Sequence, residues 1–589
     1  MIRVLISSAL LLLASVGINA QVLKWASSWN SSGTETDLGW AVTTDASGNV
    51  YTVGGAKDQA THDYQVEIIK YNSTGTQQWA TPVNTVSTSG NCDQERGYCI
   101  SIDANGYVWV SAVTYSGTTN YDDLTLLRLN SSGTIQSNYP KRYSVSTDND
   151  CDGGGPELGT ALYVYDPSNV YIGGKNFDAA TSTWSFIVLK DNVGNSGWSW
   201  TYNKSGTLHT PDNDHQVTDI KADANYVYAT GWIQNTNQSK DFWTVKLSAS
   251  TGSASWTAQY DAGGNAYPQI PNVLGIDNNG NVYVAGTEYT STWSQAVLIK
   301  YNSSGVLQAG FPVAYNGYSF GGNDAWSDMA VLTSGGSIAV YVGGYAYRGS
   351  PNCYDYTVAA YTSGGALASG WSTNPVFYDG AASESSTSAK FDRGYALEYS
   401  SNSNRVYITG RSKENTPNTG DINITTLAYN ASNGSNVWSI SYDYGSPDIS
   451  NTDEMQWKYG MQVKWNSNWC QDEIFIVGDR YTVANGYDFL TLKYGPSGSP
   501  CGFRTQNSIS NTNLYPNPFS DQAELPFEYP LTNGSLAIFD ASGRKVRLVT
   551  GINGDRILID RGNLLPGIYF YQVSENEEVV TLGRFMIVE

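Results

Sequence analysis

The sequence predicts an all-β protein, an eight-bladed β-propeller with seven blades as the alternative, followed by a small β-sandwich. Glycine (60) and tyrosine (43) are abundant and only 14% of the 589 residues are charged, which favours short strands and turns. No long segment has apolar residues at the helical period of 3.6 residues. A third observation is a recurring phrase, seen as "DASGNVYTVGG" at 45–55 and "DNNGNVYVAGT" at 277–287. Fixed-period repetition is typical of propellers and solenoids.

Each repeat contains four expected strands. A first strand such as 39–45 leads through an Asp/Asn/Gly turn into a second strand, and a third and a fourth strand follow. The second strands centre on eight aromatic residues: Tyr51, Trp109, Tyr171, Tyr228, Tyr283, Tyr341, Tyr407 and Phe475. Four strands in roughly 60 residues suit a propeller blade, whereas the alternative, a solenoid, usually has shorter repeats.

The ends of the repeat array predict how a ring would close. The eighth repeat stops near 489–502 before any fourth strand. The segment "VLKWASSWNSSG" at 22–33 resembles a fourth strand that has no repeat of its own. We therefore expect the N-terminal strand to complete the last blade and to leave no unpaired edge.

Residues 1–20 have the features of a secretory signal peptide. Arg3 precedes a short apolar stretch at 9–16, and Ala20 suits the position before cleavage. The alternative is a buried N-terminal strand. No later stretch is apolar enough to span a bilayer, so no transmembrane segment is expected. The net charge of −21 argues against nucleic acid as a partner.

Two resemblances follow from these motifs. Residues 35–498 resemble the SBBP type of β-propeller repeat, which implies a fold and an extracellular setting but no particular activity. The motifs "YPNPF", "FDASGRKV" and "LPGIYFYQV" make residues 513–589 similar to the type A C-terminal sorting domain of the type IX secretion system of Bacteroidota. That resemblance implies an Ig-like sandwich recognised by the type IX secretion machinery, and an exported protein, extracellular or on the outer-membrane surface. The alternative is an ordinary adhesion-like domain.

These features predict four parts: a signal peptide at 1–20, a propeller at 21–500, a linker at 501–512 and the sorting domain at 513–589. The loops between second and third strands, and between repeats, are long and should share one rim of the propeller. Functional residues are frequent on such loops, so we expect this rim to bind an unknown glycan or protein ligand.

One of these loops contains a candidate calcium site. Asp148, Asp150 and Asp152 alternate in "STDNDCDGGG" and precede Gly153, and alternating carboxylates can wrap a Ca²⁺ ion. Gly159 stands where an EF-hand has its bidentate glutamate, which excludes that motif. A solvated acidic loop without an ion is the alternative. No other cofactor is expected.

Six cysteines in an exported chain allow fifteen disulfide pairings. Their expected places in the blades favour Cys92–Cys151 and Cys470–Cys501. His209 and His215 lie in an acidic loop and form a weaker candidate metal site. No known catalytic motif is visible.

The sequence therefore favours a non-catalytic binding, adhesion or scaffold protein. The alternative is an extracellular enzyme on a propeller scaffold, either a glycoside hydrolase or lyase or a quinoprotein-like dehydrogenase. A glycosidase needs only two carboxylates from distant blades, and a sequence does not reveal such a pair.

Overall fold

The computed structural model describes residues 21–31, 36–57, 64–83, 95–115, 122–143, 160–178, 183–205, 215–234, 239–262, 267–317, 322–333, 336–349, 353–380, 392–413, 422–442, 453–454, 458–482, 486–497, 514–541, 544–575 and 578–589. These residues form strands and turns and no helix, as expected. The chain divides into two compact units, Met1–Asn466 with Gln471–Ser497, and Ser467–Cys470 with Gly498–Glu589.

The first unit contains seven four-stranded antiparallel sheets, each continuous in sequence. The first three are β2 (Leu38–Thr44), β3 (Val50–Lys57), β4 (Tyr64–Tyr71) and β5 (Gln77–Val83); β6 (Arg96–Ile102), β7 (Val108–Tyr115), β8 (Asp122–Leu129) and β9 (Lys141–Tyr143); and β10 (Ala161–Asp166), β11 (Asn169–Asp178), β12 (Thr183–Asp191) and β13 (Trp198–Ser205).

The next four sheets are β14 (Gln216–Ala222), β15 (Tyr226–Gln234), β16 (Lys240–Ser248) and β17 (Ala254–Tyr260); β18 (Gln269–Ile276), β19 (Val282–Tyr289), β20 (Ser294–Tyr301) and β21 (Val313–Tyr315); β22 (Ala325–Val331), β23 (Val340–Gly349), β24 (Cys353–Tyr361) and β25 (Val376–Tyr378); and β26 (Arg393–Ser400), β27 (Arg405–Lys413), β28 (Ile422–Asn430) and β29 (Asn436–Tyr442).

An eighth sheet joins the two ends of the repeat array. It contains β30 (Asp453–Glu454), β31 (Met461–Asn466), β32 (Gln471–Thr482), β33 (Gly486–Pro496) and the N-terminal strand β1 (Gln21–Trp29). Strand β1 pairs antiparallel with β33, and Trp25 lies opposite Lys493. The expected partnership between the first and last strands of the array is therefore present.

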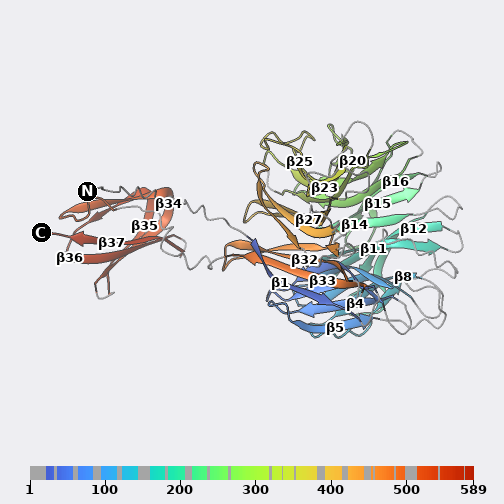
Figure 1. Ribbon diagram of the computed structural model, residues 1–589, viewed down its shortest axis with the longest axis horizontal. Helices are drawn as coiled ribbons and strands as arrows, with labels where there is room; N and C mark the ends of the chain where they lie inside the picture. Colours follow the sequence, from blue (N-terminus) through green and yellow to red (C-terminus); the bar gives the residue numbers. More distant parts are fainter. Residues whose placement is uncertain are drawn as a thin grey trace, which may run out of the picture. The chain divides into compact units, whose positions relative to one another are not determined.

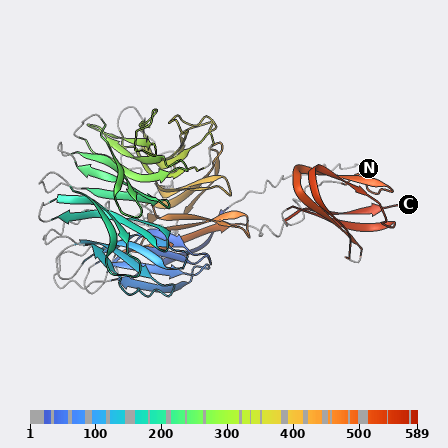
Figure 2. The ribbon, with the colours of Figure 1, turned by 180° about the vertical axis from the view of Figure 1, so that it is seen from behind.

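The sheets of this unit succeed one another around a common centre (Figures 1 and 2). The first strand of each sheet contacts the first strand of the next, from β2 through β6, β10, β14, β18, β22 and β26 to β31, which in turn contacts β2. Apolar clusters fill the spaces between neighbouring sheets. The fold is propeller-like.

The recurring phrase is explained by its turn. In the first repeat, Asp45 Oδ1 accepts hydrogen bonds from the backbone N–H groups of Ser47 and Asn49, both at 2.9 Å. Gly48 has a φ of 78°, a region that glycine enters without strain. The other carboxylate oxygen accepts a bond from the hydroxyl of Tyr51 at 3.1 Å, which ties the turn to the second strand.

Tryptophans in or shortly before the outer strands connect neighbouring sheets. Trp256 Nε1 donates to the carbonyl of Ser303 at 3.0 Å, in the next sheet's turn, and its ring packs on Gly305. Equivalent bonds link Trp25 to Ser73, Trp79 to Ser131, Trp200 to Ala249 and Trp371 to Ala431. Trp438 Nε1 is instead buried with no hydrogen-bond partner among the described residues. The next sheet is the eighth, in which β33 pairs with the N-terminal strand β1. In the other sheets a turn connects the two corresponding strands.

The second unit is a four-stranded sheet with the order β35–β34–β36–β37. Its strands are β34 (Gln522–Asp540), β35 (Lys545–Asp560), β36 (Gly567–Glu575) and β37 (Glu578–Ile587). These strands are joined in one hydrogen-bonded sheet, and the Ig-like sandwich stays a prediction from the sequence. Register shifts between Pro526 and Leu531 interrupt the long pair β34–β35, and such shifts bend strands. Leu525, Ile538 and Phe585 belong to its buried core.

Candidate functional site: a polar pocket lined by the inner strands

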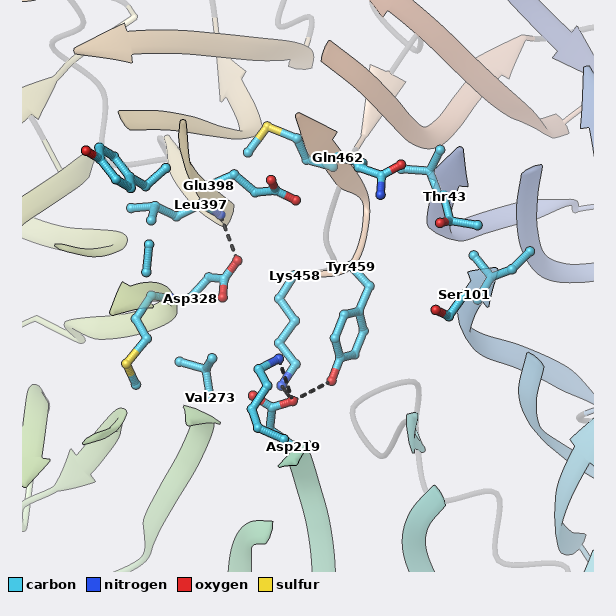
Figure 3. A pocket seen from close by; sticks show the side chains of 17 residues that line it. Thr43, Ser101, Asp219, Val273, Asp328, Leu397, Glu398, Lys458, Tyr459 and Gln462 are labelled. Carbon is cyan, nitrogen blue, oxygen red and sulfur yellow. Dashed lines mark hydrogen bonds and ion pairs between the residues drawn. The ribbon is translucent and has the colours of Figure 1, made fainter. Parts of the chain in front are cut away.

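A pocket of about 430 Å³ lies among the first strands of seven sheets (Figure 3). We call it the central pocket. Its lining consists of Val42 and Thr43 from β2, Ile100 and Ser101 from β6, Asp219 and Lys221 from β14, Val273 from β18, Asp328, Met329 and Ala330 from β22, Leu397, Glu398 and Tyr399 from β26, Met461 and Gln462 from β31, and Lys458 and Tyr459, which precede β31. Its size is typical of small-molecule sites.

Strand register brings several of these residues to the same level. Thr43, Ser101, Lys221, Glu398 and Gln462 each pair with the central aromatic residue of the adjacent second strand. They therefore occupy equivalent positions in five different sheets. The repeat holds the backbone constant here while the side chain varies from sheet to sheet.

Lys458 and Tyr459 reach from the eighth sheet to the fourth and fifth sheets. Lys458 Nζ donates to the carbonyl of Thr218 at 2.9 Å and also to that of Asn272. The hydroxyl of Tyr459 donates to Asp219 Oδ1 at 3.0 Å, and its backbone carbonyl accepts a bond from Val42 at 3.1 Å. These two residues thus form one wall of the central pocket and tie β14 to β2.

Asp219 is the ionised carboxylate of the central pocket. Burial alone would raise its pKa, but Lys221, Lys458 and hydrogen bonds from Leu274 and Tyr459 hold the pKa below its ordinary value. Lys458 Nζ lies 3.8 Å from Asp219 Oδ1, and Lys221 Nζ lies 3.6 Å from the same oxygen. Two ammonium groups therefore share one carboxylate.

Asp328 and Glu398 behave differently because burial dominates. Burial raises the pKa of Asp328 to about 7, although the backbone N–H groups of Leu397 and Met329 donate to its two oxygens. Burial likewise raises the pKa of Glu398 to about 8. The N–H of Val463 donates to Glu398 at a long 3.3 Å. At neutral pH the central pocket thus holds an aspartic acid near its midpoint and a protonated glutamic acid.

This arrangement can donate hydrogen bonds and supply positive charge to a ligand. It also contains two carboxyl groups with raised pKa values, the property of general acids and bases. Within the described residues, a possible cation site lies elsewhere, where the carboxylates of Asp355, Asp379 and Asp392 come within 4.8 Å of one another. Asp392 has a structural role as well, since it accepts bonds from the N–H groups of Gly380 and Lys413.

The sequence-based site residues lie mostly outside the described ranges. This holds for the calcium candidates Asp148, Asp150 and Asp152 and for Cys92, Cys151 and Cys501. Cys470 is disulfide-bonded, which leaves its pairing with Cys501 a prediction. Cys99 is a buried free thiol. Of the two histidines, only His215 is described; its Nδ1 accepts a bond from the N–H of Gln234, which is a structural role.

The charged residues of the central pocket were missed by the sequence analysis. They lie on first strands, where the sequence draws attention to the turn that follows. A signal was available, because Lys221 and Glu398 are charged where Thr43 and Ser101 are not, and Asp219 is charged where Ala41 and Cys99 are not. A charged residue at a strand position that is uncharged in the other repeats indicates that the surroundings of that position differ from repeat to repeat.

Comparison with known proteins identifies the C-terminal part. Residues 513–589 match the family described as secretion system C-terminal sorting domain. This segment is a type IX sorting domain. The protein is therefore exported to the cell surface or the extracellular space. No helix among the described residues is both long and apolar enough for a membrane crossing.

No curated protein sequence matches the chain. Solved structures that resemble it include the quinohemoprotein alcohol dehydrogenase from Comamonas testosteroni, with 11% identity over 82% of this chain and 78% of that one and a TM-score of 0.44. Sqt1 from Chaetomium thermophilum has 10% identity over 81% and 100% and a TM-score of 0.41. Polysaccharide lyase Uly1 has 9% identity over 78% and 90% and a TM-score of 0.36. At these values the likenesses carry no argument about this chain.

Proposed function

We propose that the exported chain is a closed eight-bladed propeller of the SBBP repeat type that binds a small polar ligand in its central pocket. The blade number is supported by seven four-stranded sheets and an eighth that contains both β1 and β33. Ring closure is supported by the contact between β31 and β2 and by the pairing of Trp25 with Lys493.

Export proceeds through the type IX machinery of a Bacteroidota-like cell. The signal peptide at 1–20 directs the first membrane crossing, and residues 513–589 are recognised at the second. The sorting domain at 513–589 supports the second step. The mature protein then remains on the surface or is released.

One observation carries the binding role: four charged residues from three sheets, and a fifth preceding β31, line the same pocket. They are Asp219, Lys221, Asp328, Glu398 and Lys458. Buried charge is costly in a protein interior, and a purely structural ring is better filled by apolar side chains. A ligand that uses these groups gives a reason for their presence. The long loops remain a second candidate surface for a glycan or protein ligand.

A glycan and metabolite array tests the binding role. The full-length protein is compared with the variants Lys221→Met and Glu398→Gln and with Lys545→Met, a control on the exposed surface of the C-terminal unit. We expect a ligand that binds the wild type and the control but binds Lys221→Met at least tenfold more weakly, as truncated charged contacts usually do. Glu398→Gln, which keeps a hydrogen-bond donor, should retain binding near neutral pH and lose binding only to a ligand that needs the carboxyl group itself. Equal binding by all four proteins would show that the ligand binds outside the central pocket.

The raised pKa values of Asp328 and Glu398 favour glycoside hydrolysis as a second candidate function. Glu398 would give its proton to the glycosidic oxygen as the bond to the anomeric carbon breaks. Asp328, as a carboxylate, would take a proton from the water that adds to that carbon. New reducing ends from a polysaccharide panel, lost in Glu398→Gln, would support this function. If no polysaccharide in the panel yields new reducing ends, the hydrolase function is rejected and the proposed binding role is unaffected.

A further inference from the structure

The central pocket has an ammonium group, that of Lys221, which lies 5.8 Å from the ring centroid of Tyr163 but has no acceptor at good hydrogen-bond distance among the described residues. Lys221 Nζ lies 3.6 Å from Asp219 Oδ1, too far for a good hydrogen bond, and no other hydrogen bond from Lys221 is found among the described residues. Its side chain is 32% exposed and lines the pocket. The N–H groups of this ammonium are available to a ligand.

Lys458 differs from Lys221 although both pair with Asp219. Two backbone carbonyls, those of Thr218 and Asn272, accept hydrogen bonds from Lys458, and its side chain is 16% exposed. Lys458 therefore fixes the pocket wall. Because it also neutralises Asp219, the charge of Lys221 is left without a full counter-ion.

The remaining acidic groups cancel only part of this charge at neutral pH. The groups that face Glu398 are Asp328 from β22, Lys221 from β14, Asp472 from β32 and the N–H of Val463 from β31. Burial outweighs the attraction of Lys221 and raises the pKa of Glu398 to about 8. Glu398 then carries a proton that it can donate, while Asp328, whose pKa is about 7, is partly protonated.

We propose that the central pocket binds a hydroxylated organic anion, a sugar acid or a sugar phosphate, whose anionic oxygens pair with Lys221 and accept a hydrogen bond from Glu398. This inference rests on the proposed binding role of the pocket. Charge-assisted hydrogen bonds of this kind are stronger than neutral ones. The hydroxyl and amide groups of Thr43, Ser101 and Gln462, on the same pocket, suit the hydroxyl groups of such a ligand.

The proposal fixes the pH dependence of binding. Above about pH 8 Glu398 loses its proton, so it no longer donates and instead repels an anion. Lys221 stays charged, because the attraction of Asp219 outweighs burial and raises its pKa above the ordinary value. Binding should therefore be tight at low pH and weaken through the titration of Asp328 and then of Glu398.

Three probes that share one sugar ring test the proposal by calorimetry on the full-length protein. Glucose is neutral, glucuronate carries a carboxylate and glucose 6-phosphate carries a phosphate. We expect at least one of the two anions to bind at least tenfold more tightly than glucose at about pH 6, and which one does so distinguishes the two sources of charge. Binding of that anion should weaken at least tenfold by about pH 9.

Two variants connect the binding to named groups. Lys221→Met should lose at least tenfold in affinity for the anion, and Lys221→Arg should recover part of it. Glu398→Gln keeps a hydrogen-bond donor at every pH, so it should still bind the anion and lose the later part of the pH dependence, which comes from Glu398. The control Lys545→Met should match the wild type, and the melting temperatures of all variants show that they are folded.

Several results would overturn the proposal. Equal affinity for glucose and the two anions would refute anion selection while leaving a pocket that binds sugars. An unchanged affinity in folded Lys221→Met would refute the assigned cation. If none of the three probes binds, the anion proposal fails, and the array above then decides separately whether the pocket binds any ligand.

Discussion

Lys458 Nζ lies 3.8 Å from Asp219 Oδ1, although Lys458 adjoins the eighth sheet and Asp219 belongs to the fourth. Lys458 precedes β31, and Asp219 lies in the middle of β14. The side chain of Asp219 is only 2% exposed, so this contact is well shielded from solvent. It joins two distant parts of the first unit and forms a wall of the central pocket.

Replacement of Lys458 tests the strength of this contact. Lys458→Met leaves Asp219 with Lys221 as its one nearby cation among the residues that the structure describes, and we expect the free energy of unfolding to fall by about 3 kcal/mol. Urea denaturation measures the loss. The double variant Lys458→Met/Asp219→Asn should regain part of it, because no buried charge is then left uncompensated. A loss below about 1 kcal/mol would show that the pair is effectively solvated.

Protein stability should fall as the pH rises from about 5 to about 9. Burial raises the pKa of both Glu67 and Glu398 to about 8, from an ordinary value of 4.5. The folded state therefore binds more protons than the unfolded state between these values, and stability decreases with pH across that window. Denaturation midpoints at several pH values measure the slope.

The variants Glu67→Gln and Glu398→Gln separate the contributions to this slope. Each should flatten the pH dependence and raise the midpoint near pH 9 relative to the wild type. Glu67 is the more informative of the two because it is 1% exposed and lies outside the pocket lining. A slope that neither variant changes would mean that these carboxyl groups ionise normally.

Two glycines test the tryptophan contacts between sheets. Gly305 has a φ of 81°, and a Cβ atom there would lie 2.6 Å from Trp256. Gly106 has a φ of 80°, and a Cβ atom on Gly106 would have no neighbouring atom within 4 Å. Gly106→Ala should cost about 1–2 kcal/mol for backbone strain alone. Gly305→Ala should cost a further 1–3 kcal/mol, roughly, because the ring must move.

Chemical denaturation of the two alanine variants gives the comparison directly. The backbone contribution is nearly the same in both, so the difference reports the contact with Trp256. Equal losses of stability would contradict the role of the indole as a contact between sheets.

The calcium site at Asp148, Asp150 and Asp152 is still a prediction from the sequence. If it exists, Ca²⁺ at about 1 mM should raise the melting temperature relative to EDTA, because a ligand that binds only the folded state stabilises it. Asp150→Asn should remove the effect, whereas Asp212→Asn, in another acidic loop, should keep it. Identical melting with Ca²⁺ and EDTA would exclude the site.

The sequence predicted the parts of the fold that are repeated. The turn at Asp45 and the aromatic residue at Tyr51 recur because every sheet needs the same turn and the same packing. The role of β1 was also predictable, since one strand was missing at one end of the array and one was spare at the other. The register shifts within the long pair β34–β35 were not, because alternation does not reveal where long strands bend.

The central pocket could not be predicted in the same way. Its residues hold equivalent positions in different sheets, but Thr43, Ser101, Lys221 and Glu398 share no residue type. Their proximity depends on the ring, which brings positions far apart in sequence to one level. The contact of Lys458 with β14 spans the distance between the eighth and the fourth sheets, and the repeat pattern gives no sign of it.

The closed ring is the claim on which the pocket depends, and a pair of disulfide traps tests it most directly. Ser27 pairs with Thr491, and Ser28 pairs with Leu490. Adjacent pairs in an antiparallel ladder alternate in Cα separation, so one of the two suits a disulfide. Mass spectrometry of the oxidised double-cysteine variants should find the 27–491 or the 28–490 cross-link in the folded monomer. Absence of both cross-links would contradict closure of the ring by the N-terminal strand.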